Sequence, residues 1–474
     1  MSSYNPITSP GTGQTIQYPK GSQYMPPWRQ PYIIGIAGCS GSGKTSVSSK
    51  IIKKINVPWT VLLSMDNFYA PLSEADRAKA FNSEYDFDRP EAFDWDHFVK
   101  CVKDLKEGSK RVEIPVYSFE KHDRTDKVLS IYGANVIILE GIYVLHDPRI
   151  LELLDMKIFV DTDLDICLAR RLNRDILHRG RDLTGAILQW NRYVKPNFDK
   201  YVRLTMSNAD ILIPRGLDNT VAIEMIIKHI SRQLTLKSHQ HIEHLIQLGH
   251  SPQELELSAQ NLIYPISESS PQLLGIHTLL LDTQTCRGDF IFFFNRMATI
   301  LITAALELIS YAPKHVVTPQ GTPFDGLQSL DEIYAISVIR AGECFENSLK
   351  KTIPTIRLGK LLIQSDSQTG EPKLHTLNLP PQLEAASEGK SGKWTILLVD
   401  AQMTSGAAAI MAISVLLDHG VKEEEIIFVT YLANYVAIKR FRSAFANVKL
   451  VVGKVEKQQG VRTPRFIDEK YYGT

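Results

Sequence analysis

Residues 38–45 read Gly-Cys-Ser-Gly-Ser-Gly-Lys-Thr, which fits the pattern G-x-x-x-x-G-K-[S/T]. The apolar run 32–38 precedes this segment, and an amphipathic stretch, 45–55, follows it. In a strand–loop–helix of this kind the glycines let several backbone N–H groups point into one concavity, and the helix adds its positive N-terminal end. The segment therefore predicts a site for the phosphates of a nucleoside triphosphate.

Each residue type in the loop has a chemical reason. Lys44 supplies a positive charge to the β- and γ-phosphates, and the hydroxyl of Thr45 can ligate Mg²⁺. The alternative is a Gly/Ser-rich turn with a chance lysine, which the strand–loop–helix context disfavours. The motif alone does not separate a kinase from a switch GTPase or a motor. The predicted phosphate-binding residues are Gly38, Ser40, Gly41, Ser42, Gly43, Lys44 and Thr45.

The rest of the first half alternates apolar runs with helical patterns. Continuous Val/Ile/Leu runs, rather than alternating ones, indicate strands that are covered on both faces. Strands that alternate with helices predict a parallel α/β sheet. The further strands are expected at 59–64, 135–141, 157–163 and 209–214, with a closing helix at 219–236.

The length of 474 residues predicts two to three domains. We expect a flexible tail at 1–30, a first domain at 31–236, a connecting helix and linker at 237–270, and a second α/β domain at 271–474. The main apolar elements expected in the second domain are 273–281, a helix at 292–308, 334–339, 394–400, a helix at 407–417, 425–433 and 447–455.

Composition excludes several functional classes. The net charge of +1 carries no footprint for a nucleic-acid polymer or an anionic membrane. Five cysteines without a CxxC pair argue against a disulfide framework or a zinc site. The N-terminus lacks the pattern of a secretory or mitochondrial leader, and no run of about 18 apolar residues predicts a membrane span. We expect a cytoplasmic protein, with the nucleus as a further location.

Two carboxylates follow predicted strands. Ligands of open α/β sheets bind at the carboxyl ends of the strands, so Asp66 is expected near the γ-phosphate. There it can deprotonate an attacking hydroxyl or hold Mg²⁺; the alternative is a helix-capping aspartate. Glu140 resembles a metal-coordinating carboxylate, and a solvated loop glutamate is an equally good interpretation.

Five arginines lie between residues 170 and 181, before and after a glycine. Arginine is suited to bidentate contact with phosphates and to stabilising charge in a transition state. An exposed helix with Arg–Asp pairs is the alternative. The density of arginines favours a mobile lid over the phosphates.

With these residues assembled, the stretch 31–236 resembles the uridine–cytidine kinase family. The resemblance implies ATP-dependent, Mg²⁺-dependent phosphorylation of uridine and cytidine at the 5′-hydroxyl. The matching segments are GCSGSGKTS, SMDNFY, YDFDRPEAFD (85–94), IPVYSFEKHDR (114–124), ILEGIY (138–143), DTDLDICLARRLNRDILHRGRD (161–182), QW…YVKPNF (189–198) and LIPRG (212–216).

The resemblance also implies a role for each site residue. Asp66 resembles the catalytic base, assisted by Lys44 and Arg174, while Thr45 and Glu140 resemble the Mg²⁺ side. Arg174 and Arg179 resemble the lid, with Arg179 on ATP. The implied nucleoside contacts are Asp88, Arg171, Arg181 and Gln189, and those implied to form the base pocket are Tyr69, Phe87, Tyr117, Phe119 and His122. Plain core packing is the alternative for Tyr117 and Phe119.

The second half resembles the uracil phosphoribosyltransferase family. Asp400, Ser405 and Gly406 fill the places of that family's phosphoribosyl-pyrophosphate loop, and Arg340 fills its Arg-Ala-Gly contact. The departures are larger: the uracil-binding glycines are absent from 463–474, and Ser365 and Asp282 stand where arginines are expected. Fewer cations and glycines weaken a pyrophosphate and base site. We therefore expect a phosphoribosyltransferase-like α/β domain with a vestigial site and no activity.

Three alternatives stay open at this point. They are a bifunctional uridine kinase and uracil phosphoribosyltransferase, a nucleotide-binding regulatory protein, and a phosphoribulokinase-like enzyme. The degraded uracil-binding motif argues against the bifunctional enzyme. Asp66 argues against a regulatory protein, and the aromatic residues of the base pocket argue against a phosphoribulokinase-like enzyme. The resemblance implies a homo-oligomer such as a tetramer, and ATP or GTP can be the donor; uridine, cytidine and ATP are the expected small-molecule partners.

Overall fold

The computed structural model describes residues 24–82, 84–108, 111–250, 255–266, 270–366, 369–386, 394–456 and 465–473. Two compact units make up the chain. The N-terminal unit is Pro26–Lys237, and the C-terminal unit is Ser238–Thr474 together with the segment that ends at Met25. The boundary lies within the long helix α8 (Thr220–Gln247).

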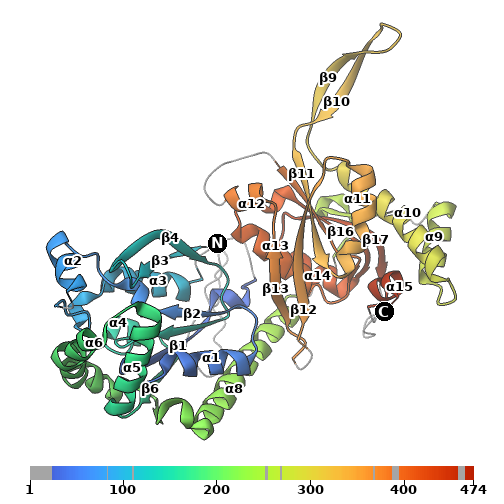
Figure 1. The fold of residues 1–474 in the computed structure, drawn as a ribbon. Helices are drawn as coiled ribbons and strands as arrows, with labels where there is room; N and C mark the ends of the chain where they lie inside the picture. The colour runs from blue at the N-terminus through green and yellow to red at the C-terminus, as the bar shows by residue number, and fades with distance from the viewer. Residues whose placement is uncertain are drawn as a thin grey trace, which may run out of the picture. The chain divides into compact units, whose positions relative to one another are not determined.

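The N-terminal unit is built on a five-stranded parallel sheet with the strand order β2-β5-β1-β6-β7 (Figure 1). Ser64 and Ile36 pair with Glu140 from either side, so the carboxyl ends of β2, β1 and β5 meet at one edge. The strands are β1 (Tyr32–Gly38), β2 (Thr60–Ser64), β5 (Val136–Glu140), β6 (Met156–Asp161) and β7 (Ile211–Pro214).

Helices cover both faces of this sheet (Figure 1). Alternate residues of β1 enter two different apolar clusters: Ile33 packs in one, and Ile34 in the other. This confirms that the continuous apolar runs are strands buried on both faces. The helices are α1 (Lys44–Ile55), α2 (Glu74–Phe81), α3 (Trp95–Lys106), α4 (Pro148–Leu151), α5 (Leu164–Arg179), α6 (Leu183–Gln189), α7 (Lys195–Asn197) and α8.

An antiparallel hairpin, β3 (Val112–Ser118) and β4 (Asp123–Ile131), stands apart from the main sheet. The register shifts between Pro115 and Tyr117, which marks a bulge or irregularity in the pairing. A bulge of this kind re-aims side chains locally. The hairpin carries aromatic residues of the resemblance segment 114–124, and it was not foreseen as a separate sheet.

The C-terminal unit has its own sheet with the order β13-β12-β11-β14-β16-β17-β8, and β15 pairs with β16. All neighbours are parallel except β12 and β13. The α/β class predicted for this half is confirmed as a mixed sheet. The strands are β8 (Ile263–Pro265), β11 (Glu332–Ile339), β12 (Arg357–Ser365), β13 (Pro372–Asn378), β14 (Trp394–Val399), β15 (Gln402–Met403), β16 (Ile426–Asn434) and β17 (Lys449–Glu456).

A second hairpin projects from this unit (Figure 1). It consists of β9 (Tyr311–Val317) and β10 (Pro323–Ser329). The helices of the unit are α9 (Pro271–Leu281), α10 (Arg287–Leu306), α11 (Glu346–Thr352), α12 (Pro381–Ala386), α13 (Ala407–Asp418), α14 (Tyr435–Ala444) and α15 (Ile467–Tyr472).

Within the described ranges, α10 alone has the length and apolarity of a membrane-crossing helix, with a mean hydropathy of 1.5. Its side chains Phe290, Phe294 and Leu301 are fully buried in the core of the C-terminal unit. Packing in that core accounts for the apolar character of the helix.

Two expected boundaries differ from the structure. The tail was expected to run to residue 30, but Tyr24 and Trp28 are buried. The stretch 237–270 was expected to be a connecting helix and linker; α8 does continue to Gln247, but β8 pairs with β17 as an edge strand of the second sheet. Residues 1–23, 251–254 and 267–269 of these two expectations lie outside the described residues.

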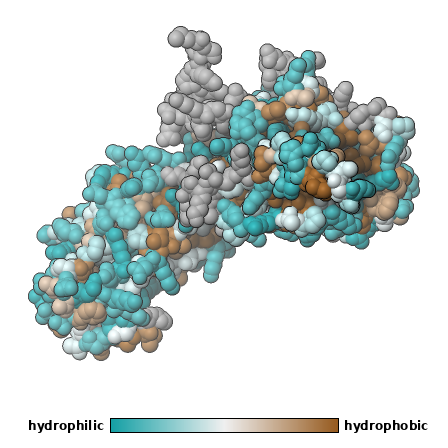
Figure 2. Space-filling model, turned by 90° about the horizontal axis from the view of Figure 1, so that it is seen from above, coloured by the Kyte–Doolittle hydropathy of each residue, from teal (hydrophilic) through white to brown (hydrophobic). Residues whose placement is uncertain are grey.

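One face of the molecule can be followed in a space-filling view (Figure 2). On the face seen in Figure 2, teal residues predominate and hydrophobic residues appear in separate patches. Scattered apolar residues on a surface are ordinary, and the even balance of 53 basic and 52 acidic residues agrees with this mixed surface.

Candidate functional site

The phosphate loop connects β1 to α1 at the carboxyl edge of the first sheet. Gly43 precedes the first helical residue with φ of 92°, and Gly41 has φ of 86°. These left-handed values favour glycine at both positions. The backbone N–H of Ser42 donates to the carbonyl of Cys39 at 3.0 Å, which closes the turn.

Gly41 is required for a second reason, the close approach of helix α5. A Cβ atom at Gly41 would lie 2.2 Å from the backbone oxygen of Cys167, a residue of α5. A Cβ at Gly43 would meet nothing nearer than 3.6 Å. One side of the loop is therefore packed against the helix that carries the arginines.

Lys44 and Thr45 face Glu140. The Lys44 Nζ donates to the carbonyl oxygens of Gly38 at 3.1 Å and Cys39 at 2.9 Å. The Thr45 Oγ1 donates to Glu140 Oε1 at 3.0 Å, while Glu140 Oε2 is buried without a hydrogen-bond partner. A hydroxyl beside a half-satisfied buried carboxylate is an oxygen-rich set of the kind that Mg²⁺ prefers, with water and phosphate oxygens as its other ligands.

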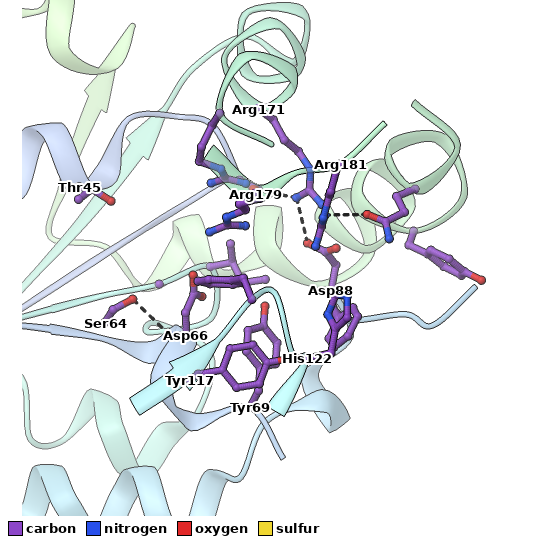
Figure 3. Close-up of a pocket in the computed structure, with 18 of the residues that line it drawn as sticks. Thr45, Ser64, Asp66, Tyr69, Asp88, Tyr117, His122, Arg171, Arg179 and Arg181 are labelled. Carbon is purple, nitrogen blue, oxygen red and sulfur yellow. Dashed lines mark hydrogen bonds and ion pairs between the residues drawn. The ribbon is translucent and has the colours of Figure 1, made fainter. Parts of the chain in front are cut away.

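Asp66 lies in a short 3-10 turn (Met65–Phe68) directly after β2. Its backbone N–H donates to the Ser64 hydroxyl at 3.4 Å, and its carboxylate makes no hydrogen bond to any residue that the structure describes. Figure 3 shows Asp66 beside Ser64, directed into the same space as Arg179. The helix-capping role that we considered for Asp66 belongs to Ser64 instead.

Aromatic rings form one wall of the site. His122 stacks on Phe87 with 5.3 Å between ring centroids and an interplanar angle of 22°. Tyr117 packs against Tyr69 at 5.0 Å and against Phe119 at 5.4 Å, and the Tyr117 hydroxyl is buried without a hydrogen-bond partner. A planar ligand with one polar edge fits such a wall.

Arginines form the opposite side (Figure 3). Arg171 donates to the Ser40 hydroxyl at 2.8 Å and lies 3.7 Å from Asp88. Arg181 donates to the Gln189 side-chain oxygen at 2.8 Å. Arg179 lies over the ring of Phe119, with 3.6 Å between the guanidinium carbon and the ring centroid.

These groups line one pocket that is open to solvent. Of the residues that we predicted for the first site, the pocket brings together Ser40, Lys44, Thr45, Asp66, Tyr69, Phe87, Asp88, Tyr117, Phe119, His122, Glu140, Arg171, Arg174, Arg179, Arg181 and Gln189. Gly38, Gly41, Ser42 and Gly43 shape the loop without lining the cavity.

Sequence reasoning missed further lining residues: Ser64, Tyr85, Gly141, Ile142 and Tyr193. Tyr85 and Phe87 make an edge-to-face contact at 4.7 Å, and Tyr193 donates to the backbone oxygen of Glu84 at 2.7 Å. Tyr85 lies within the segment YDFDRPEAFD, so its aromatic neighbour Phe87 could have pointed to it. No local signal marks Tyr193, which lies within a π-helical turn (Trp190–Val194).

Burial raises the pKa of the acidic groups in the pocket and lowers the pKa of the basic groups. Burial raises the pKa of Asp88, with Arg171 opposing, and raises the pKa of Glu140, with Lys44 and Thr45 opposing. Burial lowers the pKa of Lys44, and burial together with Arg181 lowers that of His122.

The pKa of the Arg179 guanidinium is also lowered. Burial and the charge of Arg174 lower the pKa of Arg179 to about 10, which still leaves this side chain charged at neutral pH. The pocket thus concentrates positive charge opposite an aromatic wall. Such a site suits a ligand that is anionic at one end and planar at the other.

In the C-terminal unit, the predicted phosphoribosyl-pyrophosphate residues lie at one sheet edge. Arg340 follows β11 and Asp400 follows β14, and these strands are parallel neighbours. Gly406, with φ of 80°, precedes α13, and Ser405 accepts a hydrogen bond from the N–H of Ala407 at 3.4 Å.

The charges at this second edge are paired with the C-terminal segment. Asp400 is 2% exposed and lies 3.7 Å from Arg465, and Arg340 lies 3.6 Å from Asp468. Burial raises the pKa of Asp400, with Arg465 opposing. Thr463, Pro464 and Thr474, part of the stretch expected to lack a uracil site, lie outside the described residues.

Comparisons with known proteins agree with this division. The phosphoribulokinase/uridine kinase family model matches residues 33–222, and the uracil phosphoribosyltransferase model matches residues 266–463. A protein named uridine kinase from Saccharomyces cerevisiae is 51% identical over 465 residues, covering 96% of this chain and 91% of that protein. The chain belongs to the uridine kinase family.

Other members of the uridine kinase family match along most of their length. The uridine kinase of Schizosaccharomyces pombe is 39% identical, and the match covers 96% of this chain and 98% of that protein. Uridine-cytidine kinase-like 1 of Mus musculus is 40% identical, and the match covers 91% of this chain and 78% of that protein. Both resemblances drawn from the sequence are thereby confirmed, including the two-part form of the chain.

Proposed function

We propose that this protein phosphorylates uridine and cytidine at the 5′-hydroxyl, with ATP as donor. The observation that carries the proposal is that Lys44, Asp66, Tyr117 and His122 line one pocket. A phosphate site, a free carboxylate and an aromatic wall together suit phosphoryl transfer to a nucleoside. The names of the relatives, uridine kinase and uridine-cytidine kinase, support the same substrate class.

The reaction follows from the arrangement. Asp66 accepts the proton of the 5′-hydroxyl, and the hydroxyl oxygen forms a bond to the γ-phosphorus while the bond to the β-phosphate oxygen breaks. The products are the nucleoside 5′-monophosphate and ADP. Lys44, Arg174 and Arg179 stabilise the charge that develops on the transferred group and the leaving phosphate.

The pocket residues fit a magnesium ion. Thr45 and Glu140 would hold it, because Glu140 Oε2 is a buried oxygen without a partner. A bound Mg²⁺ neutralises phosphate charge and aligns the phosphates. Residues of this chain do the rest: they orient the nucleoside, keep water out and accept the proton.

Other residues of the pocket suit the ribose and the base of the nucleoside. Asp88 and Arg171 suit the ribose hydroxyls, and Arg181 with Gln189 suits a nearby polar edge. His122 is neutral at physiological pH, because burial and Arg181 lower its pKa, so it can both donate and accept a hydrogen bond with a pyrimidine edge.

The test is an assay with ATP, Mg²⁺ and a panel of nucleosides, with Asp66→Asn beside the wild type. Uridine and cytidine should yield UMP and CMP while purine nucleosides are not converted. Asp66→Asn should lose about 10²- to 10⁴-fold in kcat, the usual contribution of a general base. Asp126→Asn, which changes an exposed aspartate of β4, is the matched control and should retain activity.

The outcomes separate the alternatives. ATP binding without phosphorylation of any nucleoside would favour a nucleotide-binding regulatory protein. Phosphorylation of a sugar phosphate, rather than a nucleoside, would favour a phosphoribulokinase-like activity. Equal activity of Asp66→Asn and the wild type would remove Asp66 from the mechanism.

We further propose that the C-terminal unit lacks uracil phosphoribosyltransferase activity. Asp400 and Arg340 engage in ion pairs with Arg465 and Asp468, and the segment that should bind uracil is short of glycine. The Lys44→Ala variant, given uracil and phosphoribosyl pyrophosphate, should form no UMP. UMP formation would instead make the protein bifunctional, because Lys44→Ala disables the kinase site.

A further inference from the structure

A carboxylate outside the predicted site lies at the centre of the arginines. Asp175 belongs to α5 and is 0% exposed. It forms ion pairs with four arginines, Arg171, Arg174, Arg179 and Arg181. Buried carboxylates require such compensation, but one partner would suffice for a structural pair.

The two oxygens of Asp175 divide the arginines by role. Oδ1 lies 2.9 Å from Arg174 and 3.6 Å from Arg179, the pair that we assign to the triphosphate. Oδ2 lies 3.5 Å from Arg171 and 3.2 Å from Arg181, the pair that we assign to the nucleoside. One rigid, planar group therefore fixes the spacing between the two sets.

The contacts of the nucleoside pair continue into both parts of the pocket. Arg181 reaches Gln189 at 2.8 Å, on the nucleoside side. Arg171 lies near Asp88 and also donates to Ser40 of the phosphate loop at 2.8 Å. A displacement of either set changes the position of Asp175, and through it the position of the other set.

Positive charge exceeds negative charge around Asp175. Burial would raise the pKa of Asp175, but Arg171, Arg174, Arg181 and Arg179 outweigh it and hold the pKa below its ordinary value. The carboxylate is thus ionised at neutral pH, and it offsets one of four nearby positive charges. Arg174 Nη2 and Arg171 Nε are buried and face Asp175, at 2.9 Å from Oδ1 and 3.5 Å from Oδ2, so the carboxylate is the group that orients both guanidinium groups.

We propose that Asp175 is a positioning residue that couples the binding of the triphosphate to the binding of the nucleoside. The proposal rests on the function and the arginine assignments given above. When one ligand orders its pair of arginines, Asp175 is held in place and the second pair is already oriented. The second ligand then binds to a preorganised site and binds more tightly.

The test measures this coupling directly. Uridine is titrated into the full-length protein by calorimetry, with and without a non-hydrolysable ATP analogue and Mg²⁺. In the wild type the analogue should tighten uridine binding by a factor within about 5- to 150-fold, the usual range of coupling between sites. In Asp175→Asn, which keeps the size but removes the charge, this factor should fall toward one.

The matched control is Asp165→Asn, which changes an exposed aspartate in the first turn of the same helix. It should retain the wild-type coupling. Asp175→Asn should also lower kcat/KM for uridine by about 10²-fold, because small displacements of positioning groups carry losses of that order. Thermal unfolding of each variant shows whether the protein is folded.

Each result bears on the proposal. A folded Asp175→Asn variant with wild-type coupling would overturn it, as would absence of coupling in the wild type. If Asp175→Asn does not fold, Asp175→Ser, which leaves room for water, is measured instead; failure of both to fold would assign Asp175 a structural role and overturn the proposal. Failure of the wild type to phosphorylate uridine would count against the proposed function, whatever the coupling.

Discussion

Glu140 is a residue whose local environment decides its chemistry. The sequence left it equally open to a metal ligand or a solvated loop residue. In the structure it is 8% exposed, accepts a hydrogen bond from Thr45 and keeps one oxygen without a partner. Burial raises its pKa above the ordinary value of 4.5, although Lys44 and Thr45 act in the other direction. Protons and Mg²⁺ therefore compete for the same carboxylate.

We predict that Glu140→Gln weakens Mg²⁺ activation by about 10- to 100-fold, the order of loss for groups that support a metal. In the wild type, the Mg²⁺ concentration for half-maximal activity should rise as the pH falls toward the raised pKa of Glu140, because the protonated acid is a poor ligand. This pH dependence should disappear in Glu140→Gln. Initial rates over a grid of pH and Mg²⁺ concentration check both points, and an unchanged pH dependence would exclude Glu140 as the titrating group.

At the scale of elements, the phosphate loop and helix α5 meet through a contact that tolerates only glycine. The backbone of Gly41 approaches Cys167 so closely that a Cβ would lie 2.2 Å from its carbonyl oxygen. Gly43 has a similar φ, but a Cβ there would make only an ordinary contact, 3.6 Å from the Arg170 side chain. The pair of glycines separates the effect of backbone strain from the effect of a clash.

We predict that Gly41→Ala lowers the free energy of unfolding more than Gly43→Ala does. Both carry about 1–2 kcal/mol of left-handed strain, and Gly41→Ala adds a clash with backbone that typically costs about 1–3 kcal/mol. Chemical denaturation of the two variants measures the difference. Equal destabilisation would mean that α5 moves away from the loop freely.

At the scale of the whole molecule, a buried network joins three segments that are distant in sequence, all within the C-terminal unit. The Tyr24 hydroxyl lies 2.9 Å from His241 Nε2, and His241 Nδ1 lies 2.7 Å from Glu371, which also accepts a hydrogen bond from Ser238. With Glu371 ionised, Nδ1 donates to it and Nε2 accepts from Tyr24. The network anchors the segment that precedes the first strand of the chain.

We predict that Glu371→Gln destabilises the C-terminal unit by about 1–3 kcal/mol, because it removes a charged acceptor from buried donors. Burial raises the pKa of Glu371, but the hydrogen bonds from His241 and Ser238 outweigh this and leave the pKa below 4.5. The stabilisation is therefore present above pH 4.5 and is lost as the pH falls through the folded-state pKa.

Unfolding curves from pH 7 to well below pH 4.5 measure that loss, which should be smaller in Glu371→Gln. Glu424→Gln, at an exposed position, is the control and should follow the wild type. Parallel pH dependence in all three proteins would show that Glu371 does not titrate differently in the folded state.

The sequence by itself determined the two α/β folds, the phosphate loop and most of the candidate pocket. Glycine spacing and continuous apolar runs are local signals. The glycines indicate where the backbone must adopt unusual dihedral angles, and the apolar runs indicate strands that are buried on both faces. Asp66 could be placed because parallel strands bring their carboxyl ends to one edge, whereas the role of Glu140 stayed open between a metal ligand and a solvated loop residue. Gly38–Thr45 needed no tertiary information at all.

Only the tertiary structure decided which groups meet across the pocket. Tyr193 lines it from within a π-helical turn, and Asp175 lies among four arginines although its sequence neighbourhood also fits an exposed helix. Tyr24 is buried, although the composition of residues 1–30 predicted a flexible tail. Burial and charge compensation depend on residues that are distant in the chain, so no local pattern contains them; the fold supplies them when it brings those residues together.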